Sequence, residues 1–137
     1  MPSAYGVVPL FNPDPSAYLP HRYPFLMLDR LLSLEPGVDG SAVRRVTTTQ
    51  GAFQQVLLVE CVAQLAGIVA IREEGEGGFL ASIDQADFTD SVCVGDSLLI
   101  TARILKSFGR LILVSGEVAC DERTLLRAQM TLGVGRL

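Results

Sequence analysis

Hydrophobic residues along the chain form one long continuous run and several shorter alternating stretches. The continuous run extends from Val56 to Ile71, and its residues are apolar on nearly every side of a helix with about 3.6 residues per turn. It predicts a helix over residues 54–73, ended by the glycines at positions 75, 77 and 78. A helix of this kind is wrapped by the rest of its protein.

Alternating polar and apolar residues predict strands on both sides of the helix in the sequence. Asp14-Pro15 predicts an N-cap and a short turn that Pro20 ends. The expected strands cover residues 26–34, 38–48, 79–88, 98–104, 111–120 and 125–134. Turn sequences separate them, among them Pro36-Gly37, Gly95-Asp96 and Gly109-Arg110.

A single helix that is apolar all round has to be enclosed by a curved sheet, because no second helix is available to cover it. The pattern therefore predicts an α+β hot-dog fold, with a long central helix wrapped by a curved antiparallel β-sheet of about six strands. We expect one domain over residues 1–137, with an irregular N-terminal arm at 1–13. One sheet leaves an exposed edge strand, so we expect a homodimer or a higher homo-oligomer.

Composition narrows the possible functions. The chain is 49% hydrophobic and 19% charged, which excludes disorder, and its net charge of −4 argues against nucleic acid as the main ligand. We expect no membrane span, no signal peptide and a cytoplasmic location, with Cys61, Cys93 and Cys120 as reduced thiols that pack like small hydrophobic residues. His21 is the only histidine, and no spacing is typical of a metal or phosphate site, so we expect neither metal nor cofactor.

Glu60 is the residue that calls for an explanation, because it lies inside the apolar run. Gln64 and Gly67 follow it one and two turns later on the same stripe of the helix. Burial of a carboxyl group favours its protonated form, which suits a general acid or base near neutral pH. A structural glutamate that is hydrogen-bonded across a subunit interface is an equally good interpretation of the sequence.

Four segments carry a pattern that extends beyond single residues. They are LPHRYPFLMLDR at residues 19–30, VECVAQLAG at 59–67, IDQADF at 83–88 and VGDSL at 94–98. In this order they resemble the 3-hydroxyacyl-[acyl carrier protein] dehydratases of type II fatty acid synthesis, over roughly residues 14–135. The resemblance implies the hot-dog fold and places Glu60 at the family's catalytic glutamate.

The chain departs from that family directly before the helix. The family carries a loop of the form G-H-F-P-G-x-P-x-M-P-G, whose histidine works with the glutamate, whereas here Phe53-Gln54-Gln55 leads almost directly into Val56. Dehydration needs a base for the C2 proton and an acid for the departing C3 hydroxyl. His21 is the imidazole that can replace the missing one; hydrogen bonding of His21 to the backbone near the first strand is the alternative.

Three functions remain open. The first is a 3-hydroxyacyl thioester dehydratase with a remodelled site, in fatty acid or polyene and polyketide synthesis. There Glu60 and His21 are catalytic, and Gln64, Gly67, Phe53 and Gln55 bind or position the substrate. The second is a non-catalytic subunit that binds an acyl chain or its carrier, and the third is a thioesterase that uses Glu60. In each case the expected partner is acyl carrier protein or its phosphopantetheine thioester, with Arg103, Lys106 and Arg110 as candidate docking residues.

Overall fold

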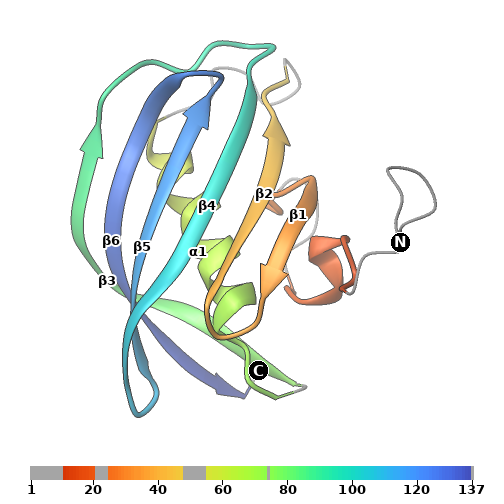
Figure 1. Ribbon diagram of the computed structural model, residues 1–137, viewed down its shortest axis with the longest axis vertical. Helices are drawn as coiled ribbons and strands as arrows, with labels where there is room; N and C mark the ends of the chain where they lie inside the picture. The colour runs from red at the N-terminus through yellow and green to blue at the C-terminus, as the bar shows by residue number, and fades with distance from the viewer. Residues whose placement is uncertain (1–10, 21–24, 48–54, 74, 137) are drawn as a thin grey trace.

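The computed structural model describes residues 11–20, 25–47, 55–73 and 75–136 as one helix packed against one antiparallel sheet (Figure 1). This confirms the predicted α+β hot-dog class, and the sheet is not closed. Its elements are a short 3₁₀ helix η1 (Pro15–Ala17), β1 (Arg30–Glu35), β2 (Asp39–Arg45), α1 (Val56–Ala70), β3 (Glu76–Phe88), β4 (Ser97–Phe108), β5 (Leu111–Cys120) and β6 (Arg123–Arg136). Asp14 caps η1 through a hydrogen bond that its side chain accepts from the Ser16 amide, as the Asp-Pro pair predicts.

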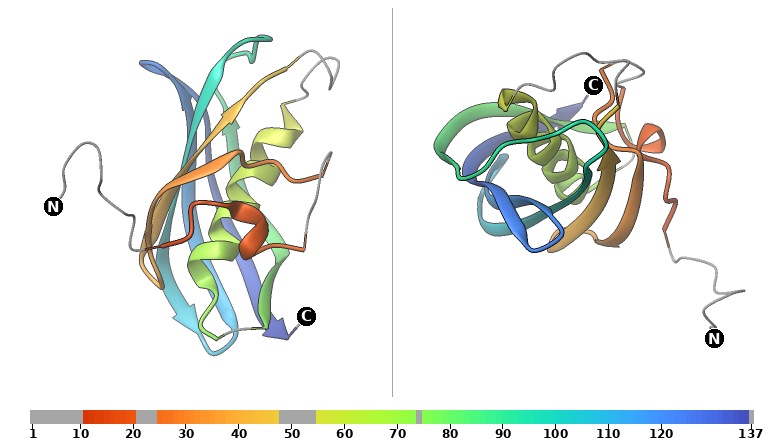
Figure 2. Two further views of the ribbon diagram at one scale, coloured as in Figure 1. Left: turned by 90° about the vertical axis from the view of Figure 1, so that its right-hand side faces the viewer. Right: turned by 90° about the horizontal axis from the view of Figure 1, so that it is seen from above.

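The order of the strands sets which parts of the chain meet. The sheet runs β1-β2-β4-β5-β6-β3, so the strand that follows the helix crosses to the far edge. Seen from above, α1 lies inside the curve of the sheet (Figure 2). The hairpin turns at 109–110 and 121–122 fall where the sequence predicts them, with Gly109 and Asp121 at positive φ.

A row of small residues lets the helix lie close to the sheet. The register aligns the members of this row on adjacent strands: Gly40, Ala102, Gly116, Ala128 and Ala86. A β-carbon at Gly116 would overlap the Val62 side chain of α1, and one at Gly40 would come within 3.0 Å of Val69. The row therefore forms the floor on which α1 rests.

The helix is covered on most but not all of its surface. Its sheet-facing residues are almost fully buried, whereas Val56 is 59% exposed and Glu60 and Ala63 are only partly buried. The expectation of a helix enclosed on every side is therefore too strong, because a sheet curved around one helix leaves one flank uncovered. Glu60 lies on that flank.

Among the element boundaries that differ from the sequence prediction are the start of β1, the end of α1 and the start of β3. β1 begins at Arg30 rather than at 26, since side chains, not a neighbouring strand, bond the backbone of residues 25–27. α1 ends at Ala70, before the glycines, and β3 already begins at Glu76. The Glu76 carboxylate accepts hydrogen bonds from the amides of Arg72 and Glu73, both at 3.1 Å, and so closes the turn after the helix.

The two edge strands of the sheet, β1 and β3, differ in what lies against them. Along β1, the amide of Leu31 donates to the carbonyl of Pro13 at 2.9 Å, so the segment before η1 lies against this edge. Along β3, Leu80 and Ile83 are 40% and 48% exposed. Polar residues such as Ser82 and Asp84 are exposed beside them, and no strand of the described chain pairs with the outer side of β3.

Two further predictions concern the thiols and membranes. The cysteines are free, as expected; Cys61 and Cys120 are buried, but Cys93 is exposed, so its assignment as a buried hydrophobic residue is wrong. Cys93 lies in the irregular loop between β3 and β4, outside the core. In the part of the chain that the structure describes, no helix is long and apolar enough to cross a membrane.

Candidate functional site

Glu60 and Gln64 are joined on the uncovered flank of α1. The Gln64 side-chain amide donates a hydrogen bond of 2.8 Å to Glu60 Oε2. Gln64 is only 3% exposed, and its position one turn after Glu60 makes the contact possible. The carboxylate is thus held by a neighbour on its own helix.

The rest of the Gln64 amide is bound by backbone from before β1. Its Nε2 also donates to the carbonyl of Phe25 at 2.9 Å, and its Oε1 accepts from the amide of Met27 at 2.8 Å. Such a fully bonded buried amide has one orientation only. The chain at 25–27 therefore fixes Gln64, and Gln64 in turn fixes the carboxylate of Glu60.

A buried arginine holds the same segment from β2. Arg44 is 7% exposed, donates from Nη1 to the Leu26 carbonyl at 3.1 Å, and lies 3.7 Å from the Asp29 carboxylate. Asp29 also accepts a hydrogen bond from the Arg45 amide at 2.7 Å. The segment that contacts Gln64 is thus anchored to the sheet as well as to the helix.

A pocket of about 220 Å³ opens beside Glu60. Glu60, Gln64 and Gly67 line one wall, so the three residues that the sequence places on one stripe of the helix contribute to the same pocket. The other lining residues are mostly apolar: Leu19, Ala63, Gly78, Phe79, Leu80 and Leu132. A carboxylate at the wall of an otherwise apolar pocket suits an acid–base step on a ligand with an apolar chain.

The remaining candidate residues lie elsewhere. Gln55 is at the N-cap of α1 and donates from its side chain to the Asp90 carbonyl at 3.2 Å; it does not line the pocket beside Glu60. His21 and Phe53 lie outside the described residues. Their roles remain predictions.

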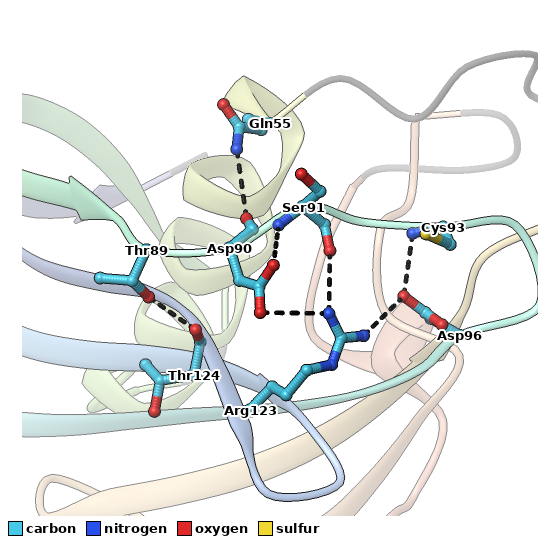
Figure 3. Close-up of polar contacts among 8 residues, drawn as sticks. All are labelled: Gln55, Thr89, Asp90, Ser91, Cys93, Asp96, Arg123 and Thr124. Atoms are coloured by element: carbon cyan, nitrogen blue, oxygen red, sulfur yellow. Dashed lines mark hydrogen bonds and ion pairs between the residues drawn. The ribbon is translucent and has the colours of Figure 1, made fainter.

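The loop between β3 and β4 is held near the start of α1 by a network that the sequence did not reveal (Figure 3). Arg123 lies 3.3 Å from the Asp90 carboxylate and 3.5 Å from that of Asp96. The hydrogen bond from the Ser91 amide lowers the pKa of the Asp90 carboxyl group, and the nearby Arg123 guanidinium lowers it further. This network orders the loop beside the helix N-terminus; the Asp-Ser pair at 90–91 was the one available sequence signal.

Cys61 cannot serve as a nucleophile in this environment. It is fully buried, and desolvation raises the pKa of its thiol to about 12. This agrees with the expectation that Cys61 packs like a small hydrophobic residue. Among the described residues no group of three or more His, Cys, Asp or Glu side chains could hold a metal ion.

The candidate docking residues fall into two environments. Arg103 and Lys106 are exposed on β4; Arg103 borders a polar hollow of about 370 Å³ that is larger than the Glu60 pocket but lined by polar and small residues. Arg110, in the turn between β4 and β5, is also exposed, but it already bonds the Val134 carbonyl at 3.2 Å and lies 3.7 Å from the Glu76 carboxylate. A docking role for each of the three residues remains a prediction.

Comparison with known proteins identifies the family. The chain is 39% identical over 124 residues to the 3-hydroxyacyl-[acyl-carrier-protein] dehydratase FabZ of Chromobacterium violaceum, covering 75% of this chain and 83% of that protein. It is 35% identical over 135 residues to FabZ of Neisseria meningitidis, covering 83% and 91%. The chain belongs to the FabZ dehydratase family. A family profile described as "Thioesterase superfamily" also matches residues 62–126.

Solved structures share the fold of this FabZ-family chain at low sequence identity. One is the dehydratase heterocomplex ApeI:P from Xenorhabdus doucetiae, with a TM-score of 0.74, 16% identity and coverage of 89% of this chain and 91% of that one. Another is a hypothetical thioesterase with coenzyme A from Streptococcus pneumoniae, with a TM-score of 0.66, 14% identity and coverage of 77% and 84%. Fold similarity alone thus extends to dehydratases and thioesterases.

Proposed function

We propose that this chain is a 3-hydroxyacyl thioester dehydratase of the FabZ family with a remodelled active site. The observation that supports the proposal is the Glu60–Gln64 pair at the wall of an apolar pocket. In this reaction a base removes a C2 proton, the C3 hydroxyl is protonated and leaves as water, and a C2–C3 double bond forms. Glu60 is the acid, and Gln64 holds it toward the pocket.

His21 is the proposed base. Its support is its place in the sequence: Leu19 lines the pocket and Phe25 accepts a hydrogen bond from Gln64, so described residues on both sides of it belong to the site. If His21 is the base, His21→Gln lowers the turnover number by about 10²–10⁴-fold. Turnover within twofold of the parent protein would remove His21 from the mechanism while leaving Glu60 in place.

The function is tested by offering the purified protein an enoyl thioester on acyl carrier protein. Loss of the conjugated enoyl absorbance and release of free thiol are followed in the same sample. The proposal predicts enoyl loss without thiol release, and its abolition in Glu60→Gln with an unchanged circular dichroism spectrum. Equal activity in that variant would refute the role of Glu60, and thiol release would indicate a thioesterase.

One observation favours a second function, a non-catalytic subunit that binds an acyl chain or its carrier. The FabZ loop with its histidine has no counterpart between Phe53 and Val56, and loss of one acid–base partner typically costs about 10²–10⁴-fold in rate. An apolar pocket retains ligand affinity without such a partner. Carrier binding without either signal in the assay above would favour this alternative.

Acyl carrier protein is the proposed partner, docking on the exposed side chains of Arg103 and Lys106. Carrier proteins are acidic, so charge complementarity favours such a surface despite the net charge of −4. The double charge reversal Arg103→Glu with Lys106→Glu should weaken carrier binding and leave binding of free pantetheine thioesters unchanged. Arg127→Glu, on β6, is the matched control. Unchanged carrier affinity in the double variant would contradict the docking site.

A second copy of the chain is the proposed cover for the open β3 edge. Leu80 and Ile83 are exposed there, and Leu80 also lines the Glu60 pocket. Pairing of two such edges would bury this apolar surface and satisfy free backbone groups.

A further inference from the structure

Gly67 lies within α1, where glycine is an unfavourable residue. It is buried, and it precedes the last helical residue, Ala70, by three positions. Glycine destabilises a helix interior relative to alanine because it loses more conformational freedom on folding. An interior helical glycine therefore usually marks a place where a side chain would be in the way.

The packing of the protein itself does not require glycine at this position. A β-carbon at Gly67 would lie 4.0 Å from both Gly78 Cα and Leu19 Cδ2, which is ordinary van der Waals contact. The facing glycine differs, since a β-carbon at Gly78 would come within 3.1 Å of Gly67 Cα. Close approach of β3 to α1 thus explains Gly78 and leaves Gly67 unexplained.

The space beside Gly67 belongs to the pocket of Glu60. Gly67 lines that pocket together with Leu19 and Gly78, the two residues that a β-carbon would touch. The pocket, at about 220 Å³, is below the roughly 300–1,000 Å³ of common ligand pockets, so one methyl group changes its capacity. Seven residues of helix separate Gly67 from Glu60, a rise of about 10 Å, which places it away from the reacting carbons.

We propose that Gly67 is a specificity-determining residue, and that the space it leaves sets how much of the acyl chain the pocket admits. The inference rests on the proposed function, because it takes the ligand to be an acyl thioester with its reacting carbons near Glu60. The apolar side chains of Leu19, Leu80 and Leu132 supply contacts for methylene groups along the pocket.

The test compares the Gly67→Ala variant with the parent protein. Affinities for butanoyl and decanoyl pantetheine analogues, with an amide in place of the thioester, are measured by titration calorimetry. Each buried methylene strengthens binding by about fourfold. We expect Gly67→Ala to reduce the decanoyl-to-butanoyl affinity ratio by roughly tenfold and to raise the melting temperature by about 3 °C.

Gly135→Ala is the matched control, because a β-carbon there meets no atom within 4 Å and the residue does not line the pocket. It should leave the affinity ratio unchanged. An unchanged ratio in Gly67→Ala, or a lower melting temperature, would overturn the role of Gly67 alone. Binding of neither analogue to the parent protein would overturn the proposed function and this inference with it.

Discussion

At the scale of single residues, Gln64 organises the candidate site more than Glu60 does. Its amide bonds one carboxylate and two backbone groups, and all three contacts are between 2.8 and 2.9 Å. The sequence predicted that Glu60, Gln64 and Gly67 share a stripe, because that follows from helical periodicity. It could not predict the backbone partners at Phe25 and Met27, since no pattern states which distant backbone groups meet a buried amide.

Replacing Gln64 by leucine should therefore destabilise the protein. The buried Met27 amide loses its acceptor, and we expect the free energy of unfolding to fall by about 1–3 kcal/mol. Urea denaturation measures the change, with Gln55→Leu as the control, because Gln55 is exposed and makes one longer hydrogen bond. A loss in Gln64→Leu no larger than in the control would contradict this account.

Cys61 makes a prediction about pH. Burial raises the pKa of its thiol from 9.0 to about 12, so above pH 9 the unfolded chain loses this proton while the folded protein keeps it. The free energy of unfolding therefore keeps its full value below pH 9. Between pH 9 and 12 it falls, by at most about 1.4 kcal/mol per pH unit, because only the unfolded chain loses the proton. Urea denaturation at pH 8 and 10 should show a smaller decline in Cys61→Ala than in the parent protein; equal declines would exclude this effect.

At the scale of elements, the sequence predicted the helix and the strands well, and their boundaries less well. Alternating polar and apolar residues predict a strand correctly when one face of the strand is buried and the other is exposed. This is the case in β4, where Leu98, Ile100 and Ala102 face the core. The start of β1 was placed too early because residues 26–28 are apolar for another reason: Met27 and Leu28 are buried in the hydrophobic core, and Leu26 packs against it, although the segment lies outside the sheet. Alternation cannot distinguish these two kinds of burial.

The row of small residues under α1 can be tested at Gly116. A methyl group there would overlap Val62 and lie 3.0 Å from the Thr101 carbonyl, so Gly116→Ala should cost about 1–3 kcal/mol of stability. Adding Val62→Ala removes the side chain that is overlapped. We expect the double variant to be more stable than the sum of the two single changes predicts, as measured by denaturant unfolding. Strict additivity would show that the helix does not rest on this row.

At the scale of the whole molecule, the asymmetry between the two sheet edges bears on assembly. The segment before η1 bonds β1, whereas β3 forms the other edge of the sheet (Figure 1) and exposes Leu80 and Ile83, of which Leu80 also lines the pocket. The sequence predicted an exposed edge from the count of elements. Which edge stays open follows from the crossover that places β3 last in the sheet, and the sequence carries no signal for that order.

The proposed dimer predicts a specific effect at Ile83. Ile83→Asp places a charge on the open edge and should convert a dimer into a monomer, as measured by size-exclusion chromatography with light scattering. Leu99→Asp is the control, because Leu99 is similarly exposed, at 42% against 48% for Ile83, but lies on β4. A monomeric parent protein, or a dimer unaffected by Ile83→Asp, would contradict association through β3.

The central claim is that the pocket beside Glu60 interconverts 3-hydroxyacyl and enoyl thioesters. A catalyst reaches the same equilibrium from either side, so the most direct measurement starts the purified protein once from 3-hydroxyacyl carrier protein and once from enoyl carrier protein. Mass spectrometry of the carrier then gives the ratio of the two thioesters. Our account predicts convergence on one ratio, and none in Glu60→Gln. Two samples that remain as they started, or that release the free acid, would contradict it.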